Sequence, residues 1–154
     1  MGEIKLKGNP YVGEKVRLRP YELSDVESIM EHWNTYKSRR FLGTFTPHSS
    51  LQEEDFIRMQ VKWADEKRAF AFVITDKNTG AFIGGTGCHE IDWINRSTTV
   101  GIAIHNPENL EKGYGSDALR CVLKFCFNIL NLNRVELGVY EFNTRAIHVY
   151  EKVG

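Results

Sequence analysis

The sequence has no long apolar run and no excess of charge of either sign. Its longest apolar stretches, such as residues 70–74, are far shorter than the ~20 residues that a membrane-spanning helix needs. Lys and Arg together number 20, and Asp and Glu also number 20. The whole chain therefore offers no field that would attract phosphate backbones or anionic lipid. We expect no membrane span and no nucleic-acid partner.

Cysteine is scarce, and its spacing fits neither a disulfide framework nor a metal site. The three cysteines are Cys88, Cys121 and Cys126, an odd number without metal-ligand spacing. No signal-peptide pattern precedes Lys5. These observations indicate a reducing, cytoplasmic setting and a protein without a metal. We expect the cysteines to pack as small apolar side chains and not to act as nucleophiles.

What is present is the composition of one globular domain. Hydrophobic residues make up 42% of the 154 residues, aromatic residues 12% and charged residues 26%. A chain of this length is large enough for one compact core and too short for two. We expect an irregular lead-in over residues 1–14 and a single domain over residues 15–154.

The first half of the chain predicts one strand followed by two helices. Residues 16–20 alternate apolar and basic side chains before a proline, which is typical of a strand. Residues 24–27 and 50–53 both have the Ser-x-x-Glu spacing of a capping box. Apolar residues follow each box at helical spacing, so the two helices are expected to end near residues 34 and 67.

The second half predicts a hairpin, a third strand, a long helix, one more strand and a short last helix. The expected ranges are 70–74, 81–85, 98–104, a helix from the glycines to about residue 129, 135–139 and 144–153. The long helix should be the longest and the most buried. The order β-α-α-β-β-β-α-β-α predicts an α+β fold whose central twisted sheet is mostly antiparallel, with helices on both faces.

The most informative segment is Lys112-Gly113-Tyr114-Gly115, which lies between a predicted strand and the long helix. Glycines at a helix start let the backbone approach a ligand closely, and the free amides and the helix dipole favour a pyrophosphate. The alternative is a glycine-rich turn that merely enters a helix. The segment is not a phosphate-binding GxxxxGK[ST] loop, and Ala118 or Leu119 stands where a dinucleotide GxGxxG motif needs glycine.

Several blocks of the sequence together resemble the GNAT superfamily of N-acetyltransferases. They are Lys112 to Gly115, Leu132 to Leu137 and Asn143 to Gly154, with further agreement at Val16 to Pro20, Glu90 to Trp93 and Asn95-Arg96. Within the superfamily, the chain is similar to the branch that contains ribosomal-protein N-terminal acetyltransferases and spermidine acetyltransferases. The resemblance covers residues 15–154 and implies a GNAT-like fold.

The resemblance implies acetyl-coenzyme A as a cosubstrate. In the family, the matching segment donates backbone amides to the coenzyme A pyrophosphate, here from Lys112, Gly113, Tyr114, Gly115 and Ser116. The strand that holds Ile102, Ala103 and Ile104 matches the one whose backbone pairs with the pantetheine arm. Leu110 stands where the family commonly has Gln or Arg. Because main-chain groups hold most of the phosphate, we expect this change to affect affinity more than function.

The resemblance also implies roles for two residues of the last block. Tyr150 matches the tyrosine that stands near the coenzyme sulfur and protonates the leaving thiolate, a task that suits a phenol. The alternative is an aromatic side chain that only packs the last helix. Asn143 matches an asparagine that contacts the coenzyme arm, and its alternative is an ordinary cap at the helix start.

The acceptor amine must lose a proton before attack, so a base is required near the acetyl carbonyl. Glu90 is the first candidate, because it matches a carboxylate of this branch at the end of the third strand; the alternative is a solvated strand-end charge. His89 alternates to the opposite face and ranks second. A backbone amide near Ile102 is expected to stabilise the oxyanion.

These assignments predict an N-acetyltransferase that moves acetyl directly from acetyl-coenzyme A to a primary amine in a ternary complex. The acceptor is a protein N-terminus or a polyamine-like small molecule. The alternative is a coenzyme-A-binding module with little or no turnover. The acceptor region is expected to include Trp33 with Arg39 and Arg40, and also Phe41 and Phe45, although solvated charges and core aromatics are the better interpretation.

The family usually continues past residues 150–154 into two more strands. A chain that ends here is expected to lack the usual C-terminal strand pair, which leaves the predicted strand 135–139 as an exposed edge. We therefore expect either a shortened domain with impaired activity or a homo-oligomer in which another subunit supplies a strand.

Overall fold

The computed structural model describes residues 9–39 and 46–154. Its main elements are β1 (Val16–Arg19), α1 (Val26–Trp33), α2 (Tyr36–Arg39), α3 (Ser50–Asp65), β2 (Phe70–Asp76), β3 (Phe82–Asp92), β4 (Ser97–Ile104), α4 (Tyr114–Lys124), β5 (Arg134–Glu136) and α5 (Thr144–Val153). Apart from the short α2, this is the predicted order. Residues 1–8 of the predicted lead-in, and Arg40, Phe41 and Phe45, lie outside the described residues.

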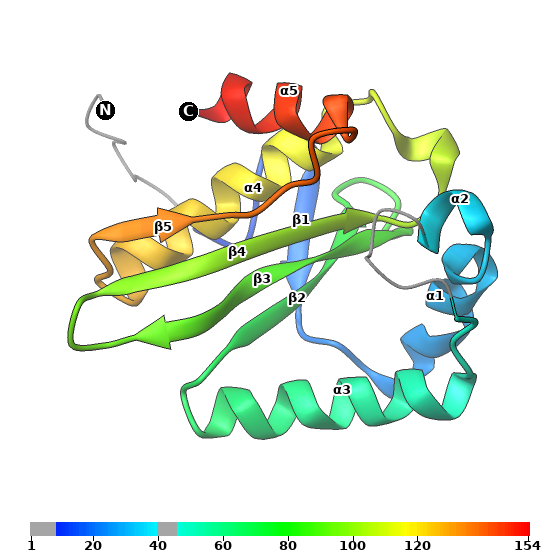
Figure 1. The fold of residues 1–154 in the computed structure, drawn as a ribbon, viewed down its shortest axis with the longest axis horizontal. Helices are drawn as coiled ribbons and strands as arrows, with labels where there is room; N and C mark the ends of the chain where they lie inside the picture. Colours follow the sequence, from blue (N-terminus) through cyan, green and yellow to red (C-terminus); the bar gives the residue numbers. More distant parts are fainter. Residues whose placement is uncertain (1–8, 40–45) are drawn as a thin grey trace.

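The five strands form one sheet in the order β1-β2-β3-β4-β5. Neighbouring strands are antiparallel except β4 and β5, which are parallel. Helices α1 and α3 cover one face of the sheet, and α4 and α5 cover the other (Figure 1). The predicted α+β fold with a mostly antiparallel sheet and helices on both faces is confirmed.

The main core lies between the sheet and α4. On β1, Val16 and Leu18 are buried while Arg17 between them is exposed, as alternation predicts. The apolar face of α4 packs on β1, β3 and β4. All three cysteines are buried, as expected. A smaller core lies on the other face, where α1 and α3 meet through Ile29 and Ile57. The sequence periodicities therefore identified the buried faces of the main elements.

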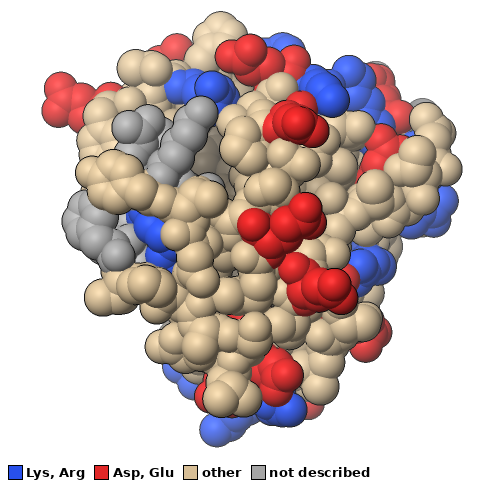
Figure 2. Space-filling view, turned by 90° about the vertical axis from the view of Figure 1, so that its right-hand side faces the viewer, with Lys and Arg blue, Asp and Glu red and all other residues tan. Residues whose placement is uncertain are grey.

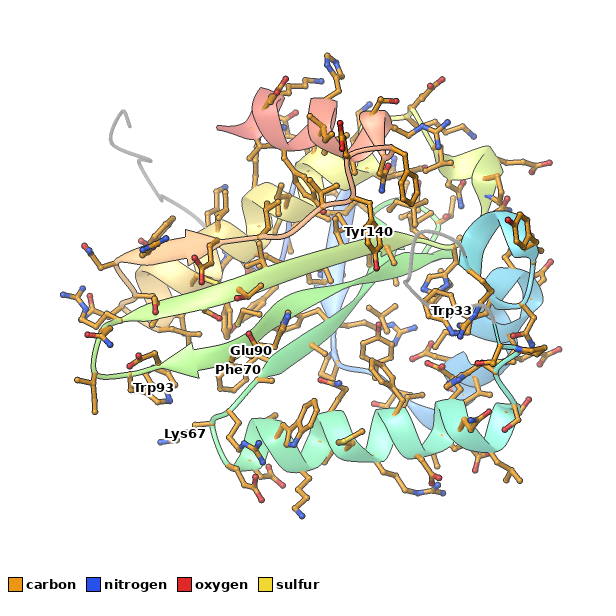
Figure 3. All side chains as sticks on the ribbon, viewed as in Figure 1. Trp33, Lys67, Phe70, Glu90, Trp93 and Tyr140 are labelled. Carbon is orange, nitrogen blue, oxygen red and sulfur yellow. The ribbon has the colours of Figure 1, made fainter. Side chains whose placement is uncertain are left out.

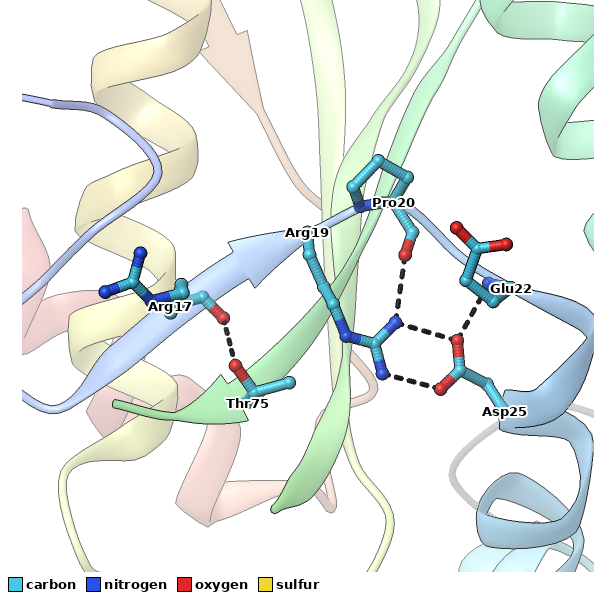
Figure 4. Close-up of polar contacts among 6 residues, drawn as sticks. All are labelled: Arg17, Arg19, Pro20, Glu22, Asp25 and Thr75. Atoms are coloured by element: carbon cyan, nitrogen blue, oxygen red, sulfur yellow. Dashed lines mark hydrogen bonds and ion pairs between the residues drawn. The ribbon is translucent and has the colours of Figure 1, made fainter. Parts of the chain in front are cut away.

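The capping box predicted at Ser24 and Glu27 is replaced by one at Glu22 and Asp25, in the segment that links β1 to α1. Both nitrogens of the Arg19 guanidinium fork donate to Asp25, at 2.9 Å to Oδ2 and 2.6 Å to Oδ1 (Figure 4). The backbone N–H of Glu22 also donates to Asp25 Oδ2, at 2.8 Å. The box is formed by Glu22 and Asp25 because the chain already turns helically at residues 23–25, so Ser24 lies inside the turn.

The start of α3 also differs from the prediction by one residue. Ser49, not Ser50, is the N-cap: its Oγ accepts from the N–H of Gln52 at 3.1 Å, and Gln52 Oε1 accepts from the N–H of Ser49 at 2.8 Å. Adjacent serines offer the same pattern in two registers, and Gln serves in the box as well as Glu does. As a result, Glu53 is not used in capping and is buried instead.

Several element lengths differ from the sequence prediction. Strand β3 runs to Asp92, well beyond the expected range 81–85. The strand predicted at residues 135–139 is reduced to Arg134–Glu136, because β5 pairs with β4 over only three residues before the chain diverges. The longest α-helix is α3, with 16 residues; α4 has 11 and continues as a π-helical turn over Phe125–Ile129. The segment of α4 is nevertheless the most buried helix, as predicted.

One face of the molecule carries charge of both signs (Figure 2). On the face that carries α1 and α2, acidic and basic side chains are intermixed (Figure 2). This arrangement agrees with the equal numbers of acidic and basic residues in the chain. Within residues 9–39 and 46–154, no helix has the length and apolarity that crossing a bilayer requires.

Asp117 ties the entry of β1 to α4. Its carboxylate is 7% exposed and accepts from the backbone N–H groups of Glu14 at 3.1 Å, Lys15 at 2.8 Å and Val16 at 3.0 Å. We expect Asp117→Ala to lower the free energy of unfolding by about 3 kcal/mol in urea denaturation, because three amides lose a charged acceptor. Asp55→Ala, at a side chain that is 80% exposed, should change it by less than about 0.5 kcal/mol. Equal effects of the two variants would contradict the role of Asp117.

Candidate functional site

The site is organised by the point at which β4 and β5 separate. Strand β4 pairs with β3 from Ser97 to Ile104 but with β5 only from Ser97 to Thr99. In the part of the chain that the structure describes, the other edge of β4 therefore has no strand partner from Val100 to Ile104. Such an edge presents unpaired backbone N–H and C=O groups, which is the arrangement that an extended ligand needs.

A cleft of about 200 Å³ lies along this free edge, between β4, the start of α4 and α5; we call it the α5 cleft. Six residues that the sequence predicted for the coenzyme or for catalysis line it: Ile102, Ala103, Ile104, Gly115, Asn143 and Tyr150. Leu110 also lines the cleft. The structure thus brings together residues from three segments that are far apart in the sequence.

The start of α4 has the features that backbone binding of an anion requires. Gly113 is the N-cap, with a φ of 83° that favours glycine, and no side chain caps the helix. At Gly115, an added Cβ would meet nothing closer than Ile102 Cδ1 at 3.9 Å and Val149 Cγ1 at 4.0 Å. A Cβ at Gly115 would thus make ordinary contacts with both side chains, and the glycine lines the α5 cleft beside the uncapped helix N-terminus, where a phosphate can approach.

Three other residues of this segment are not part of the cleft lining. The Tyr114 hydroxyl donates to Asp76 Oδ2 at 2.6 Å, and Ser116 is buried. The Lys112 carbonyl accepts from Lys15 Nζ at 2.8 Å. None of the three lines the α5 cleft. Any contribution of Lys112, Tyr114 and Ser116 to coenzyme binding would therefore come from their backbone, and it stays a prediction.

On α5, Asn143 and Tyr150 both line the α5 cleft. Asn143 Oδ1 accepts from the N–H of Ala146 at 3.2 Å and caps the helix, which confirms its interpretation as a cap; contact with a coenzyme stays a prediction. Tyr150 is half-buried, and burial raises the pKa of its phenol above the ordinary value. The phenol is therefore protonated at neutral pH and available as a proton donor.

A larger cavity of about 710 Å³ lies on the opposite side of β4, bounded by α1, α3, β2 and β3; we call it the α3 cavity. It shares Trp33, Ile102, Ala103 and His105 with the α5 cleft. The two spaces therefore meet at one short stretch of β4. Ligands bound in the two spaces would therefore come close to each other at this stretch.

The α3 cavity contains a buried acid that the sequence had assigned to a cap. Glu53 is 3% exposed, and His48 Nε2 lies 3.2 Å from its Oε2. Burial raises the pKa of Glu53 to about 6, although the nearby Arg39 guanidinium opposes this shift. Burial, and then Arg39, lower the pKa of His48. At neutral pH the pair is therefore mainly a carboxylate beside an uncharged imidazole.

Arg39 is not the solvated charge that the sequence suggested, whereas Trp33 packs against the smaller core, as the interpretation of a core aromatic expects. Arg39 is 6% exposed, and its guanidinium carbon lies 5.7 Å from the centroid of the Trp33 ring. Both residues line the α3 cavity, and Trp33 lines the α5 cleft as well. The basic doublet in the sequence does not reveal the burial of Arg39, because that burial depends on tertiary neighbours such as Trp33 of α1.

His105 lies where the two spaces meet and was not predicted from the sequence. It is 6% exposed, and its ring centroid is 4.4 Å from that of Trp33 and 5.4 Å from that of Phe82. Burial, with a smaller contribution from His32, lowers its pKa to about 4, and its Nδ1 has no hydrogen-bond partner. The only sequence signal was its place at a strand end, immediately before Asn106.

The two residues predicted as bases lie in different surroundings. Glu90 is exposed, has a φ of 51° and lies at an irregularity in the β3–β4 pairing. It lines neither space, and Figure 3 shows it toward the Trp93 end of the sheet, away from Trp33. His89 lines the α3 cavity. The structure thus does not bring Glu90 together with Tyr150, and the catalytic role of either candidate stays a prediction.

Comparison with known proteins agrees with this geometry. Residues 15–154 match the model of the acetyltransferase (GNAT) domain. The chain is 30% identical over 135 residues to the uncharacterized N-acetyltransferase p20 of Bacillus licheniformis, covering 87% of this chain and 75% of that protein. It is also 30% identical over 135 residues to the spermidine N(1)-acetyltransferase of Vibrio cholerae, covering 87% and 69%.

The fold matches a solved structure as well. The crystal structure of spermidine N-acetyltransferase from Vibrio cholerae in complex with CoA and spermine superposes with a TM-score of 0.78 at 28% sequence identity. The match covers 90% of this chain and 79% of that chain. The arrangement of sheet and helices described above is thus shared with a protein that binds both a coenzyme and an amine.

Proposed function

The chain belongs to the GNAT family of N-acetyltransferases, and we propose that it transfers acetyl from acetyl-coenzyme A to a primary amine by direct attack in a ternary complex. The observation that carries this proposal is the meeting of the α5 cleft and the α3 cavity at Ile102 and Ala103. Two ligands that enter from opposite sides of β4 reach the same strand. Holding them together in this way lowers the entropic cost of their reaction.

The α5 cleft fits the coenzyme. The unpaired edge of β4 suits the amide groups of a pantetheine arm, and the uncapped start of α4 at Gly115 suits a pyrophosphate. The cosubstrate supplies the activated acetyl thioester. We propose that a backbone amide near Ile102 stabilises the oxyanion that forms during transfer.

In the proposed reaction, the nitrogen of the neutral amine forms a bond to the acetyl carbonyl carbon, and the carbon–sulfur bond breaks. Tyr150 donates its phenolic proton to the departing thiolate, and the amine loses one proton to a base. Glu90 is the base predicted from the sequence; His89 and Glu53, which line the α3 cavity, are two further candidates. The products are an N-acetylated amine and a free thiol, with no acyl-enzyme.

Release of free thiol tests the function directly. We expect acetyl-coenzyme A to release thiol in the presence of at least one amine from a panel of polyamines, including spermidine, ribosomal-protein N-terminal peptides, aminoglycosides and free amino acids. Initial rates measured against both substrates should give intersecting lines, because a ternary complex forms; parallel lines would indicate a covalent intermediate. Calorimetric binding of acetyl-coenzyme A without acceleration by any amine would favour the coenzyme-binding module instead.

A further inference from the structure

The α3 cavity contains a buried cation that forms no ion pair with any residue the structure describes. Arg39 is 6% exposed, lines the cavity, and its Nε has no hydrogen-bond partner. None of the ion pairs found within residues 9–39 and 46–154 involves Arg39. A guanidinium stays charged in a protein, so this group holds a full positive charge at the wall of the cavity.

Such an arrangement is costly unless a ligand completes it. Arginine is almost never fully buried without a partner, because desolvating a charge is compensated only by an opposite charge with good hydrogen bonds. The ring of Trp33, 5.7 Å from the guanidinium carbon, recovers part of this cost but accepts no hydrogen bond in the plane of the guanidinium. The unmet requirement of Arg39 is therefore for an anionic group that enters the cavity.

The carboxylate of the same cavity does not meet this requirement. Oε2 of Glu53 lies 3.2 Å from Nε2 of His48. The charge of Arg39 lowers the pKa of Glu53, but the two side chains do not form an ion pair. Because its pKa is about 6, Glu53 is mostly ionised at neutral pH, so the charges of Glu53 and Arg39 nearly cancel. A polycation would find that the carboxylate of Glu53 is already paired with His48. An anion would find a buried guanidinium whose Nε has no hydrogen-bond partner.

We propose that the acceptor is a small amine that also carries a carboxylate, such as an amino acid, and that Arg39 binds this carboxylate. The inference rests on the proposed function and specifies its substrate class. The planar guanidinium matches a carboxylate in two-point hydrogen bonding. With its carboxylate at Arg39, the amine of such a molecule is directed toward Ile102 and Ala103, where the α3 cavity meets the α5 cleft.

Matched acceptor pairs test this on the unmodified protein. Thiol release is measured with each standard amino acid and with its α-carboxamide, which has nearly the same shape but no negative charge, and with spermidine. We expect kcat/KM for the best free acid to exceed that of its carboxamide by at least about thirtyfold, because the carboxamide leaves a buried charge unpaired. A carboxamide has the less basic amine, so the fraction of reactive neutral amine favours it and works against the expected result.

Variants show whether Arg39 is responsible. Arg39→Gln should reduce the preference for the free acid to less than about threefold and leave acetyl-coenzyme A affinity within about twofold by calorimetry. Arg39→Lys should keep part of the preference, because it keeps the charge but loses the fork. Arg58→Gln, at an arginine that is 58% exposed, serves as the matched control and should keep all of it.

The outcomes separate this inference from the proposed function. Equal rates for free acids and carboxamides, or a spermidine rate above both, overturn the inference while the acetyltransferase function stands. A free-acid preference that persists in Arg39→Gln removes Arg39 from acceptor recognition. Failure of every amine to release thiol overturns both proposals.

Discussion

Replacing Tyr150 by phenylalanine is expected to lower kcat about a thousandfold and to leave the affinity for acetyl-coenzyme A within about twofold. The tyrosine lines the α5 cleft, and burial keeps its pKa above the ordinary value, so the phenol is protonated when the thiolate leaves. Phenylalanine preserves the ring that packs α5 and removes only the proton. A loss confined to the transition state appears in kcat and not in binding.

The matched control is Tyr140→Phe, at a tyrosine that is 47% exposed on the segment between β5 and α5 (Figure 3). It should change kcat by less than about twofold. Coenzyme affinity is measured by calorimetry, and turnover by thiol release with saturating acceptor. If Tyr150→Phe weakens binding and turnover equally, the residue only packs the last helix and has no part in the chemistry.

Replacing Gly115 by leucine is expected to weaken acetyl-coenzyme A binding by at least about a hundredfold, or about 3 kcal/mol. A Cβ alone would fit in ordinary contact with Ile102 and Val149, but the remaining leucine atoms would extend into a cleft of only about 200 Å³. Leucine is a better helix former than glycine, so the fold should not lose stability. Gly113 is less suitable for this test, because its φ of 83° would strain any other side chain.

Arg120→Leu introduces the same side chain on the exposed face of the same helix and should leave coenzyme binding within about twofold. Calorimetry gives both affinities, and thermal unfolding confirms that both variants are folded. Unchanged binding in Gly115→Leu would mean that the coenzyme does not pass the start of α4, and the assignment of the α5 cleft would then be wrong.

The local pattern of the sequence was sufficient for most of the fold. Alternation at Val16 and Leu18, and the helical spacing of apolar residues through α4, identified the elements and the faces that they bury. Such patterns depend on spacings of two, three or four residues, which any segment contains within itself. The same locality explains the one-residue shift at α3, since Ser49 with Gln52 and Ser50 with Glu53 satisfy the same capping rule.

Much of the lining of the α5 cleft was also accessible from the sequence. Glycines at a helix start are a local signal for an anion site, and the resemblance implied that Ile102, Gly115 and Tyr150 share one site; all three line the α5 cleft. The length of β5 could not be predicted from the sequence. Residues 135–139 alternate as a strand does, but the pattern does not show where pairing with β4 ends. That divergence is what opens the α5 cleft.

The sequence by itself determined the order of the elements, the buried faces and the loop at the start of α4, because each is set by neighbours along the chain. Only the tertiary structure decided that Arg39, Glu53 and His105 lose contact with water in or beside one cavity. The physical reason is that desolvation and charge pairing depend on what surrounds a group in space. For these three residues, the surroundings come from α1, α3 and β4, which are distant in the sequence.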